Sequence, residues 1–216
     1  MIELPKKDET GKSYLSYSQY SKWKGSKKDY IKSYFLGEKF EGNAYTEFGS
    51  MIGEALENDN FDGFEPHEVR LLSSVTRLDE FERKILFDLG DFGVLGYIDT
   101  NDNKGGVVTT IIDYKTGALD KEEVYQDSDY DQVTIYAGAI EQETGVLPLK
   151  GWVELIERNG NPFKGEQLTL GGSVVTIDQD VSREAVDAVK GRLIKVAEDI
   201  SDHYKVFKAL ESLIQI

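Results

Sequence analysis

The stretch IIDYKTG, residues 111–117, places an aspartate and a lysine two positions apart at the end of an apolar run. Alternate side chains share one face of a β-strand, so a strand here would point Asp113 and Lys115 in the same direction. An Asp–Lys pair on an exposed face would show the same spacing without any function. A second acid on the same face is therefore needed before the pair indicates chemistry.

The candidate for that second acid is Asp99, which closes the preceding predicted strand in the stretch GYID. A three-residue loop at 104–106 would pair Asp99 with Ile111. Asp99 would then lie on the face of Asp113, one diagonal step and roughly 7–8 Å away. A two-residue turn at 105–106 would shift the register by one and put the two acids on opposite faces. We therefore expect the three-residue loop.

Two carboxylates and a lysine at one sheet edge are suited to phosphodiester hydrolysis. The carboxylates of Asp99 and Asp113, with the backbone carbonyl of Tyr114, offer oxygen ligands for Mg²⁺ or Mn²⁺. Such a cation lowers the pKa of a bound water and neutralises charge on the phosphate. Lys115 would contact the attacking water or the phosphate, as a cation or as a base with a depressed pKa.

Composition narrows the class of protein. The chain has 216 residues, 39% of them hydrophobic, which fits one domain spanning residues 1–216. It contains no cysteine, which excludes disulfides, thiolate zinc sites and iron–sulfur clusters. Residues 1–11 are polar and do not resemble a signal peptide, and no apolar run reaches membrane-spanning length. We expect a cytosolic protein that does not bind membranes.

The net charge of −15 argues against a non-specific polyanion binder, but the basic residues are unevenly spread. Residues 6–39 interleave lysines with tyrosines and a tryptophan. One interpretation is a solvated, lysine-rich helix. The other is a strip that follows a phosphate backbone while aromatic rings stack on bases. The second interpretation makes Lys22, Lys24, Lys27 and Lys28 DNA-binding candidates.

Periodicity and turn residues predict an α/β fold with a mixed sheet. Ser16 or Ser18 is a suitable N-cap for the first helix, and Gly145 is a suitable residue to end a later one. The residues expected in helices are 16–35, 47–58, 129–145, and 181 to about 203 with another turn or two after it. Strands are expected at 92–99, 106–117 and 150–158, with a weaker one at 166–178. Residues 68–78 and 83–90 are expected to form strands or short elements.

The stretches GYID, IIDYKTG and QVTIYA, in this order, resemble the PD-(D/E)XK nuclease superfamily. The fold that this implies is a restriction-endonuclease-like core, a mixed sheet flanked by helices in the order αβββαβ. The similarity is greatest to RecB-type nucleases, which include stand-alone phage and bacterial exonucleases and the Cas4 proteins. It covers residues 16–152 and implies that Asp99 and Asp113 bind metal and that Lys115 is catalytic. It also implies that Gln132 and Tyr136 face the site and contact Lys115 or DNA, although an ordinary i,i+4 helix pair has the same spacing.

The helix before the sheet departs from this branch. RecB-type nucleases read G-x-x-x-H there, whereas GSMIG places Gly53 at the position of the histidine. Neither His67 nor His203 has a matching context, and we expect both at the surface. Related families use a glutamate on this helix. Glu57 lies one turn beyond Gly53 and is our candidate for the metal ligand, with Glu54, about 100° away, as the substitute.

The absence of cysteine is the second departure, because Cas4-like members carry a four-cysteine iron–sulfur cluster. The resemblance therefore favours a compact stand-alone exonuclease of the phage type, in the cytoplasm of a bacterium or of a phage-infected cell. It implies DNA as the substrate and a role in DNA recombination, repair or replication. A recombinase, a single-strand-binding protein or a replication protein would be the protein partner.

Three functions stay open on the sequence. The first is a Mg²⁺- or Mn²⁺-dependent DNA exonuclease, favoured over an endonuclease. The second is a decayed nuclease fold that acts as an acidic DNA mimic or binding protein, for which the missing histidine and the net charge are the arguments. The third is a structural or adaptor domain with a metal-free Asp–Lys cluster. Retention of Lys115 favours the enzyme, because a mimic has no use for a cation in an acidic pocket.

Overall fold

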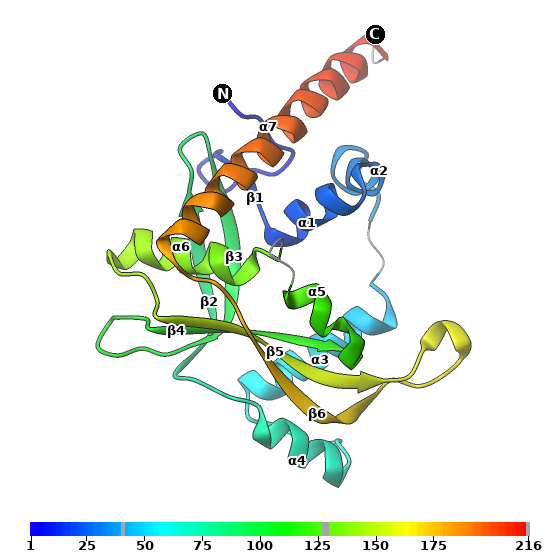
Figure 1. Ribbon diagram of the computed structural model, residues 1–216. Coiled ribbons are helices and arrows are strands. Elements are labelled where there is room, and N and C mark those ends of the chain that lie inside the picture. Colours follow the sequence, from blue (N-terminus) through cyan, green and yellow to red (C-terminus); the bar gives the residue numbers. More distant parts are fainter. Residues whose placement is uncertain (40–41, 127–129, 215–216) are drawn as a thin grey trace.

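A mixed six-stranded sheet forms the centre of the computed structural model, which describes residues 1–39, 42–126 and 130–214 (Figure 1). The strand order is β1-β3-β4-β5-β6, and β2 pairs with β3. Strand β1 is parallel to β3 and β4 is parallel to β5, whereas the other pairs are antiparallel. The strands are β1 (Ser13–Leu15), β2 (Glu80–Asp88), β3 (Phe92–Asn101), β4 (Thr110–Gly117), β5 (Lys150–Asn159) and β6 (Thr169–Asp178).

Helices cover both faces of this sheet. The helices are α1 (Tyr17–Gly25), α2 (Lys27–Tyr30), α3 (Ala44–Glu57), α4 (Pro66–Ser74), α5 (Glu122–Gln126), α6 (Gln132–Thr144) and α7 (Arg183–Ile214). One apolar cluster joins α6 and α7 to the strands, and a smaller one joins α3 and α4 to β5 and β6. Figure 1 shows α6 and α7 on one side of the strands and α3 and α4 on the other. The predicted α/β class is confirmed, and α3, β2, β3, β4, α6 and β5 follow in the expected αβββαβ order, with the short helices α4 and α5 inserted.

Local capping explains where several helices begin and end. The hydroxyl of Ser16 accepts a hydrogen bond from the backbone N–H of Gln19, so Ser16 rather than Ser18 caps α1. The predicted helix over 16–35 divides at Ser26, which ends α1 and caps α2, and a π-helical turn over Ile31–Phe35 follows. Gly145 ends α6 in the left-handed conformation, as expected. The predicted start of that helix at residue 129 lies outside the described residues.

Two elements differ in part from the expectation. Residues 68–78, expected to form a strand or a short element, lie partly in a short helix, because Pro66 opens α4 and Glu65 and Glu68 form a capping box around its first turn. The last helix, expected to run to about residue 203 with another turn or two after it, continues unbroken to Ile214. Within the described ranges, no helix combines the length and the apolar character needed to cross a bilayer.

The expected three-residue loop between β3 and β4 was also wrong. Lys104 and Val107 form a bridge around a two-residue turn, in which Gly105 and Gly106 both have positive φ. Further from the turn, Asn101 pairs with Ile111. Between this pair and the Lys104–Val107 pair, the chain leading into β4 has one residue more than the chain leaving β3. This extra residue acts as a β-bulge and cancels the shift in register that the shorter turn would cause.

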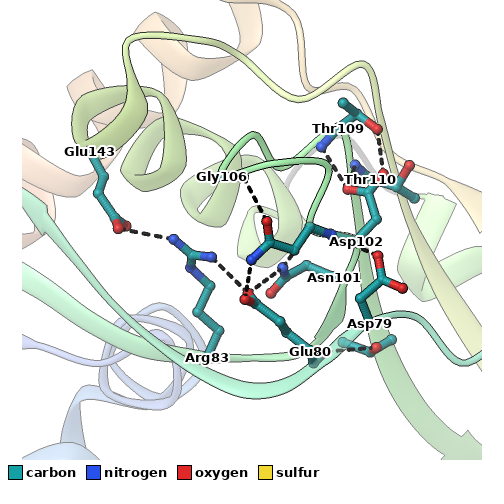
Figure 2. A network of polar contacts seen from close by, with 11 residues as sticks. Asp79, Glu80, Arg83, Asn101, Asp102, Gly106, Thr109, Thr110 and Glu143 are labelled. Atoms are coloured by element: carbon teal, nitrogen blue, oxygen red, sulfur yellow. Dashed lines mark hydrogen bonds and ion pairs between the residues drawn. The ribbon is translucent and has the colours of Figure 1, made fainter.

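Asp102 holds the bulge in place. Its carboxylate accepts hydrogen bonds from the backbone N–H groups of Thr109 (2.6 Å) and Thr110 (2.8 Å), and from the Thr109 hydroxyl (Figure 2). Burial opposes ionisation of this carboxyl, but the hydrogen bonds from Thr109 and Thr110 lower the pKa of Asp102 below its usual value. The buried carboxylate of Asp102 therefore fixes the register between β3 and β4. The sequence analysis had expected the length of the loop to set it.

Candidate active site

The site begins where β3 and β4 separate. Their pairing covers Asn101 with Ile111 and Thr100 with Ile112. Asp99 and Asp113 are the next residues on the two strands, opposite one another, at the point where β3 continues beside β2 and β4 continues beside β5. The two acids are thus directly across from each other, rather than one diagonal step apart as the sequence argument expected.

Asp99 completes the hydrogen bonding of the separating strand. Its Oδ2 atom accepts a hydrogen bond of 2.6 Å from the backbone N–H of Tyr114. A backbone N–H that leaves a ladder needs another acceptor, and here a side chain supplies it. The contact places the Asp99 carboxylate next to the backbone of β4 between Asp113 and Lys115.

Asp113 is fully buried, and its two oxygens have different surroundings. Oδ2 forms an ion pair with Nζ of Lys115 and accepts a hydrogen bond of 3.1 Å from the Tyr130 hydroxyl. Oδ1 is buried and has no hydrogen-bond partner among the residues that the structure describes. An unsatisfied carboxylate oxygen is costly inside a protein, so this atom is suited to a ligand such as a cation.

The charges in this group are strongly coupled. Burial, and then the negative charge of Asp113, raise the pKa of Asp99 to about 7. Desolvation acts against the charged form of Lys115, but Asp113 and Asp99 outweigh it, and the pKa of Lys115 is raised. Of the two roles considered for this lysine, the cation agrees with this direction and the base with a depressed pKa does not. Its side chain is 27% exposed, which leaves the ammonium within reach of a bound substrate.

Gln132 and Tyr136 connect to this group through a residue that the sequence analysis missed. The Tyr130 hydroxyl lies 3.0 Å from Oε1 of Gln132, whose Nε2 donates to the Tyr136 hydroxyl at 2.6 Å. Of the two expected contacts, with Lys115 or with DNA, the structure connects Gln132 to Lys115 only indirectly, through Tyr130 and Asp113. A Cβ at Gly96 would lie 2.9 Å from the Tyr136 ring, so the glycine of GYID lets this tyrosine approach β3. No spacing rule indicated Tyr130; its position beside QVTIYA was the available signal.

A cleft of about 700 Å³ is lined by Asp99 and Lys115, whereas Asp113 is buried beside it. One wall is α3, where Gly53 leaves open space at the position that the family gives to histidine. Glu57 and Glu54 are both exposed and both line this wall. The other lining residues are Thr46, Gly49, Ser50, Ile52, Asn58, Phe81, Glu82, Asp99, Tyr114, Lys115 and Thr116.

Glu82 is a second residue that sequence reasoning missed. It lies across from Asp99 on β2, between two regular pairs, with the unusual φ of +48°. Partial burial, and then the charge of Glu57, raise the pKa of Glu82. Glu82 and Glu57 therefore approach each other across the cleft, from β2 and from α3.

The lysine-rich N-terminal helices are close to aromatic rings, as their sequence suggested, but several lysines also pair with acids. Lys28 is exposed on α2. The other three lie over the rings of Tyr34 (Lys22, 5.6 Å), Tyr20 (Lys24, 5.1 Å) and Trp23 (Lys27, 5.0 Å). Lys24 is 4.0 Å from Asp131, and Lys27 is 2.5 Å from Asp199. His67 and His203 are exposed, as expected, and far along the chain from the acids of the site.

The donors at the site suit a hard divalent cation in part. Asp99 lies across from Asp113, whose Oδ1 is free, and both offer carboxylate oxygens. The carbonyl of Tyr114, the next residue in β4, is the third oxygen ligand that the sequence suggested. In the described ranges, no three His, Cys, Asp or Glu side chains are gathered closely enough to form a complete cage. A cation here would thus take its remaining ligands from water and from the substrate, which is typical of Mg²⁺ sites that act on phosphates.

The sequence matches the family profile of the PD-(D/E)XK nuclease superfamily over residues 15–214. The chain belongs to the PD-(D/E)XK nuclease superfamily. The resemblance drawn from three short stretches is confirmed, and the match is longer than the 16–152 it suggested. Membership supports a metal-dependent nuclease that acts on DNA.

One solved structure supports the fold. A protein named "Putative exonuclease" from Eubacterium rectale superimposes with a TM-score of 0.53 at 16% identity, covering 89% of this chain and 84% of that chain. A structure of the protein SSO0001 has a TM-score of 0.42 at 14% identity, covering 88% of this chain and 78% of that chain. No curated protein matches the sequence. At these identities the first likeness supports the shared fold alone.

Proposed function

We propose that this PD-(D/E)XK nuclease is a Mg²⁺- or Mn²⁺-dependent DNA exonuclease of the RecB type. The observation that carries the proposal is that Asp99, Asp113 and Lys115 meet at the separation of β3 and β4, where Asp99 and Lys115 line a cleft and Asp113 is buried beside them. The surrounding cleft is large enough for a nucleotide and is lined mainly by polar side chains.

Asp99, Asp113 and the Tyr114 carbonyl would hold the cation, with Glu57 on α3 completing the set through water and Glu54 as the substitute. When bound, the cation supplies an activated water and neutralises charge on the scissile phosphate. The unpartnered Oδ1 of Asp113 supports this assignment, because it is a buried oxygen with no acceptor role inside the described protein.

The remaining residues would orient the reacting groups. Lys115 stays protonated next to Asp113, so its ammonium can donate to a phosphate oxygen or orient the attacking water. Gln132 and Tyr136 would position Tyr130, whose hydroxyl fixes the rotamer of Asp113. The two residues named in the QVTIYA stretch would thus act through Asp113 rather than on DNA.

Lys22, Lys24, Lys27 and Lys28 would guide the DNA strand toward the cleft. Their neighbouring tyrosines and tryptophan support this role, whereas the pairing of Lys24 and Lys27 with acids reduces the charge available. We place the enzyme in DNA recombination, repair or replication, in the cytoplasm of a bacterium or of a phage-infected cell. A recombinase, a single-strand-binding protein or a replication protein would be its partner.

The alternative is a decayed nuclease that mimics DNA, and the net charge of −15 favours it. Such a protein has no need of a lysine paired with a fully buried aspartate, which costs desolvation without providing a negative surface. The ion pair between Lys115 and Asp113 therefore favours the enzyme.

The deciding experiment is cleavage of end-labelled linear DNA and closed-circular DNA, single- and double-stranded, with Mg²⁺, Mn²⁺ or EDTA. Metal-dependent loss of linear DNA with circular DNA left intact is the expected result, and Lys115→Ala should lose it. Cleavage of the circles would replace the exonuclease with an endonuclease. Folded protein that leaves every substrate intact would favour the DNA mimic.

A further inference from the structure

The connection between β5 and β6 holds an aromatic side chain in solvent. In Figure 1 it extends away from the sheet as a hairpin. At its tip, Phe163 occupies a 3₁₀ turn over Pro162–Lys164 and is 82% exposed. A single exposed apolar residue is ordinary, so the feature needs further observations before it indicates binding.

Hydrogen bonds hold the backbone of this hairpin. Asn161 caps the turn by accepting a hydrogen bond of 3.1 Å from the backbone N–H of Phe163. The backbone N–H of Glu166 closes the loop onto the Asn161 carbonyl at 3.1 Å. At Gly160, with φ of +91°, an added Cβ would lie 2.1 Å from the carbonyl oxygen of Gln167. A backbone already held at Phe163 lowers the entropic cost of binding a ligand there.

Phe163 belongs to a larger group of flat side chains. Its ring centroid is 5.8 Å from that of Tyr45, at the start of α3, and the Tyr45 hydroxyl donates to Asn161 Oδ1 at 3.3 Å. On the tyrosine ring lies the guanidinium of Arg158, with its central carbon 4.0 Å from the centroid. An arginine with an aromatic ring beneath it and an exposed phenylalanine beside it is suited to one phosphate and one base.

Arg158 lacks the partner that a half-buried arginine needs. Its Nε atom is buried without a hydrogen-bond acceptor, and no carboxylate in the described ranges forms an ion pair with it. Stacking on Tyr45 fixes the plane of the guanidinium but satisfies none of its N–H groups. A phosphate oxygen is the acceptor that this geometry and charge fit best.

Two residues of this group are close along the chain to residues that line the cleft or pair with its lining. Tyr45 is followed in α3 by Thr46, which lines the cleft, and Arg158 lies two residues beyond Ile156, the strand partner of the lining residue Thr116. Burial raises the pKa of the Tyr125 hydroxyl, and the charges of Lys115 and Arg158 both act against this rise. A strand whose phosphate reaches Lys115 can place a neighbouring phosphate at Arg158.

We propose that Arg158, Tyr45 and Phe163 form a nucleotide clamp that binds an unpaired stretch of the substrate strand. Arg158 binds a backbone phosphate beside the scissile one, and Phe163 stacks on the base of that nucleotide. A base paired within a duplex does not offer its face to Phe163, so the clamp selects single-stranded ends. The proposal rests on the proposed function for the identity of the ligand as DNA.

The test is binding without cleavage. Fluorescence anisotropy in EDTA would compare a labelled single-stranded 15-mer with a blunt duplex of the same sequence. Phe163→Ala should weaken binding of the single strand by about tenfold, because one stacked base is lost, and should change duplex binding much less. Arg158→Gln should weaken single-strand binding. It should also lower the slope of the logarithm of the binding constant against the logarithm of salt concentration by about one, because one phosphate contact is lost.

Leu149→Ala and Lys150→Gln are matched controls on the opposite end of β5, since Leu149 is 78% exposed and Lys150 is an exposed cation. Both should bind as the unchanged protein does. Circular dichroism would verify the fold, and Phe163→Ala alone carries the test if Arg158→Gln does not fold. Single-strand binding unaffected by Phe163→Ala, or an equal loss for single strand and duplex, would overturn the clamp. Protein that binds single strands through Phe163 but never cleaves them would overturn the proposed function and leave the clamp standing.

Discussion

The carboxylate of Asp99 accepts a hydrogen bond from the backbone N–H of Tyr114, 15 positions along the chain and on the neighbouring strand. The contact closes the end of the β3–β4 ladder with a charged side chain in place of a backbone carbonyl. It also holds the Asp99 carboxylate close to that of Asp113, which two negative charges would otherwise oppose. A structural hydrogen bond thus holds together two acids that repel one another without a cation.

This arrangement predicts an unusual dependence of stability on pH. The folded pKa of Asp99 is about 7, above its usual value of 3.8, so between these values the folded protein binds more protons than the unfolded chain. The contribution of Asp99 to the free energy of unfolding is therefore full below pH 3.8 and is lost as the pH rises to about 7. Urea unfolding in EDTA at several pH values measures it.

Asp99→Asn is the control for that prediction, because the amide keeps an oxygen that can accept from Tyr114 and carries no charge. Its stability in EDTA should exceed that of the unchanged protein at pH 8, and the difference should shrink toward pH 4. The same substitution should abolish cleavage. A stability difference independent of pH would show that Asp99 does not repel Asp113.

Removal of the Lys115 ammonium should separate metal binding from cleavage. In Lys115→Ala, Oδ2 of Asp113 loses its ion-pair partner, so binding of Mn²⁺ should be as tight as in the unchanged protein or tighter. Cleavage should fall by about 100-fold or more, since a positioned charge at the phosphate is lost. Isothermal titration with Mn²⁺ and a single-turnover cleavage assay measure the two effects. Weaker Mn²⁺ binding in the variant would assign Lys115 to the integrity of the site instead.

The sequence was sufficient to predict those parts of the fold and of the candidate site that depend on residues close together in the chain. The spacing of Asp113 and Lys115 and the order of GYID, IIDYKTG and QVTIYA were sufficient for the family and the α/β sheet, because they report strands and motifs directly. The loop length was wrong because the register depends on a bulge held by Asp102, and a binary pattern of polar and apolar residues contains no signal for it. Tyr130 and Glu82 were missed because tertiary packing alone brings them to the acids.

The α3 wall gives a prediction about the missing histidine. Glu57 influences the pKa of Glu82 across the cleft, which places its carboxylate on the cleft side of the helix. Glu57→Gln should therefore raise the Mg²⁺ concentration needed for half-maximal cleavage by about tenfold, whereas Glu54→Gln should raise it much less. A Mg²⁺ titration of the cleavage rate compares the two. The reverse order would assign the ligand position to Glu54.

Tyr130→Phe tests the connection between Asp113 and the QVTIYA helix. The change removes one hydroxyl, which lies 3.1 Å from Asp113 Oδ2 and 3.0 Å from Gln132 Oε1, and leaves the packing of the ring intact. We expect about tenfold weaker apparent metal affinity, because the Asp113 rotamer is no longer fixed. Tyr125→Phe is the matched control, since its ring packs on Tyr130 and no described contact hydrogen-bonds its hydroxyl. Equal effects of the two substitutions would show that the Tyr130 hydroxyl has no special role in holding Asp113.

Asp102→Ala tests whether the bulge sets the geometry of the site from a distance. The change leaves the backbone N–H groups of Thr109 and Thr110 without their acceptor in a partly buried position, which should cost about 1–2 kcal/mol of unfolding free energy. Asp102 contacts neither Asp99 nor Asp113, so a merely structural role predicts normal cleavage at temperatures where the variant is folded. We expect cleavage to fall as well, because a shift of one residue in β4 would turn Asp113 away from Asp99. Urea unfolding beside a cleavage assay measures both effects, with the exposed loop substitution Asp62→Ala as the control.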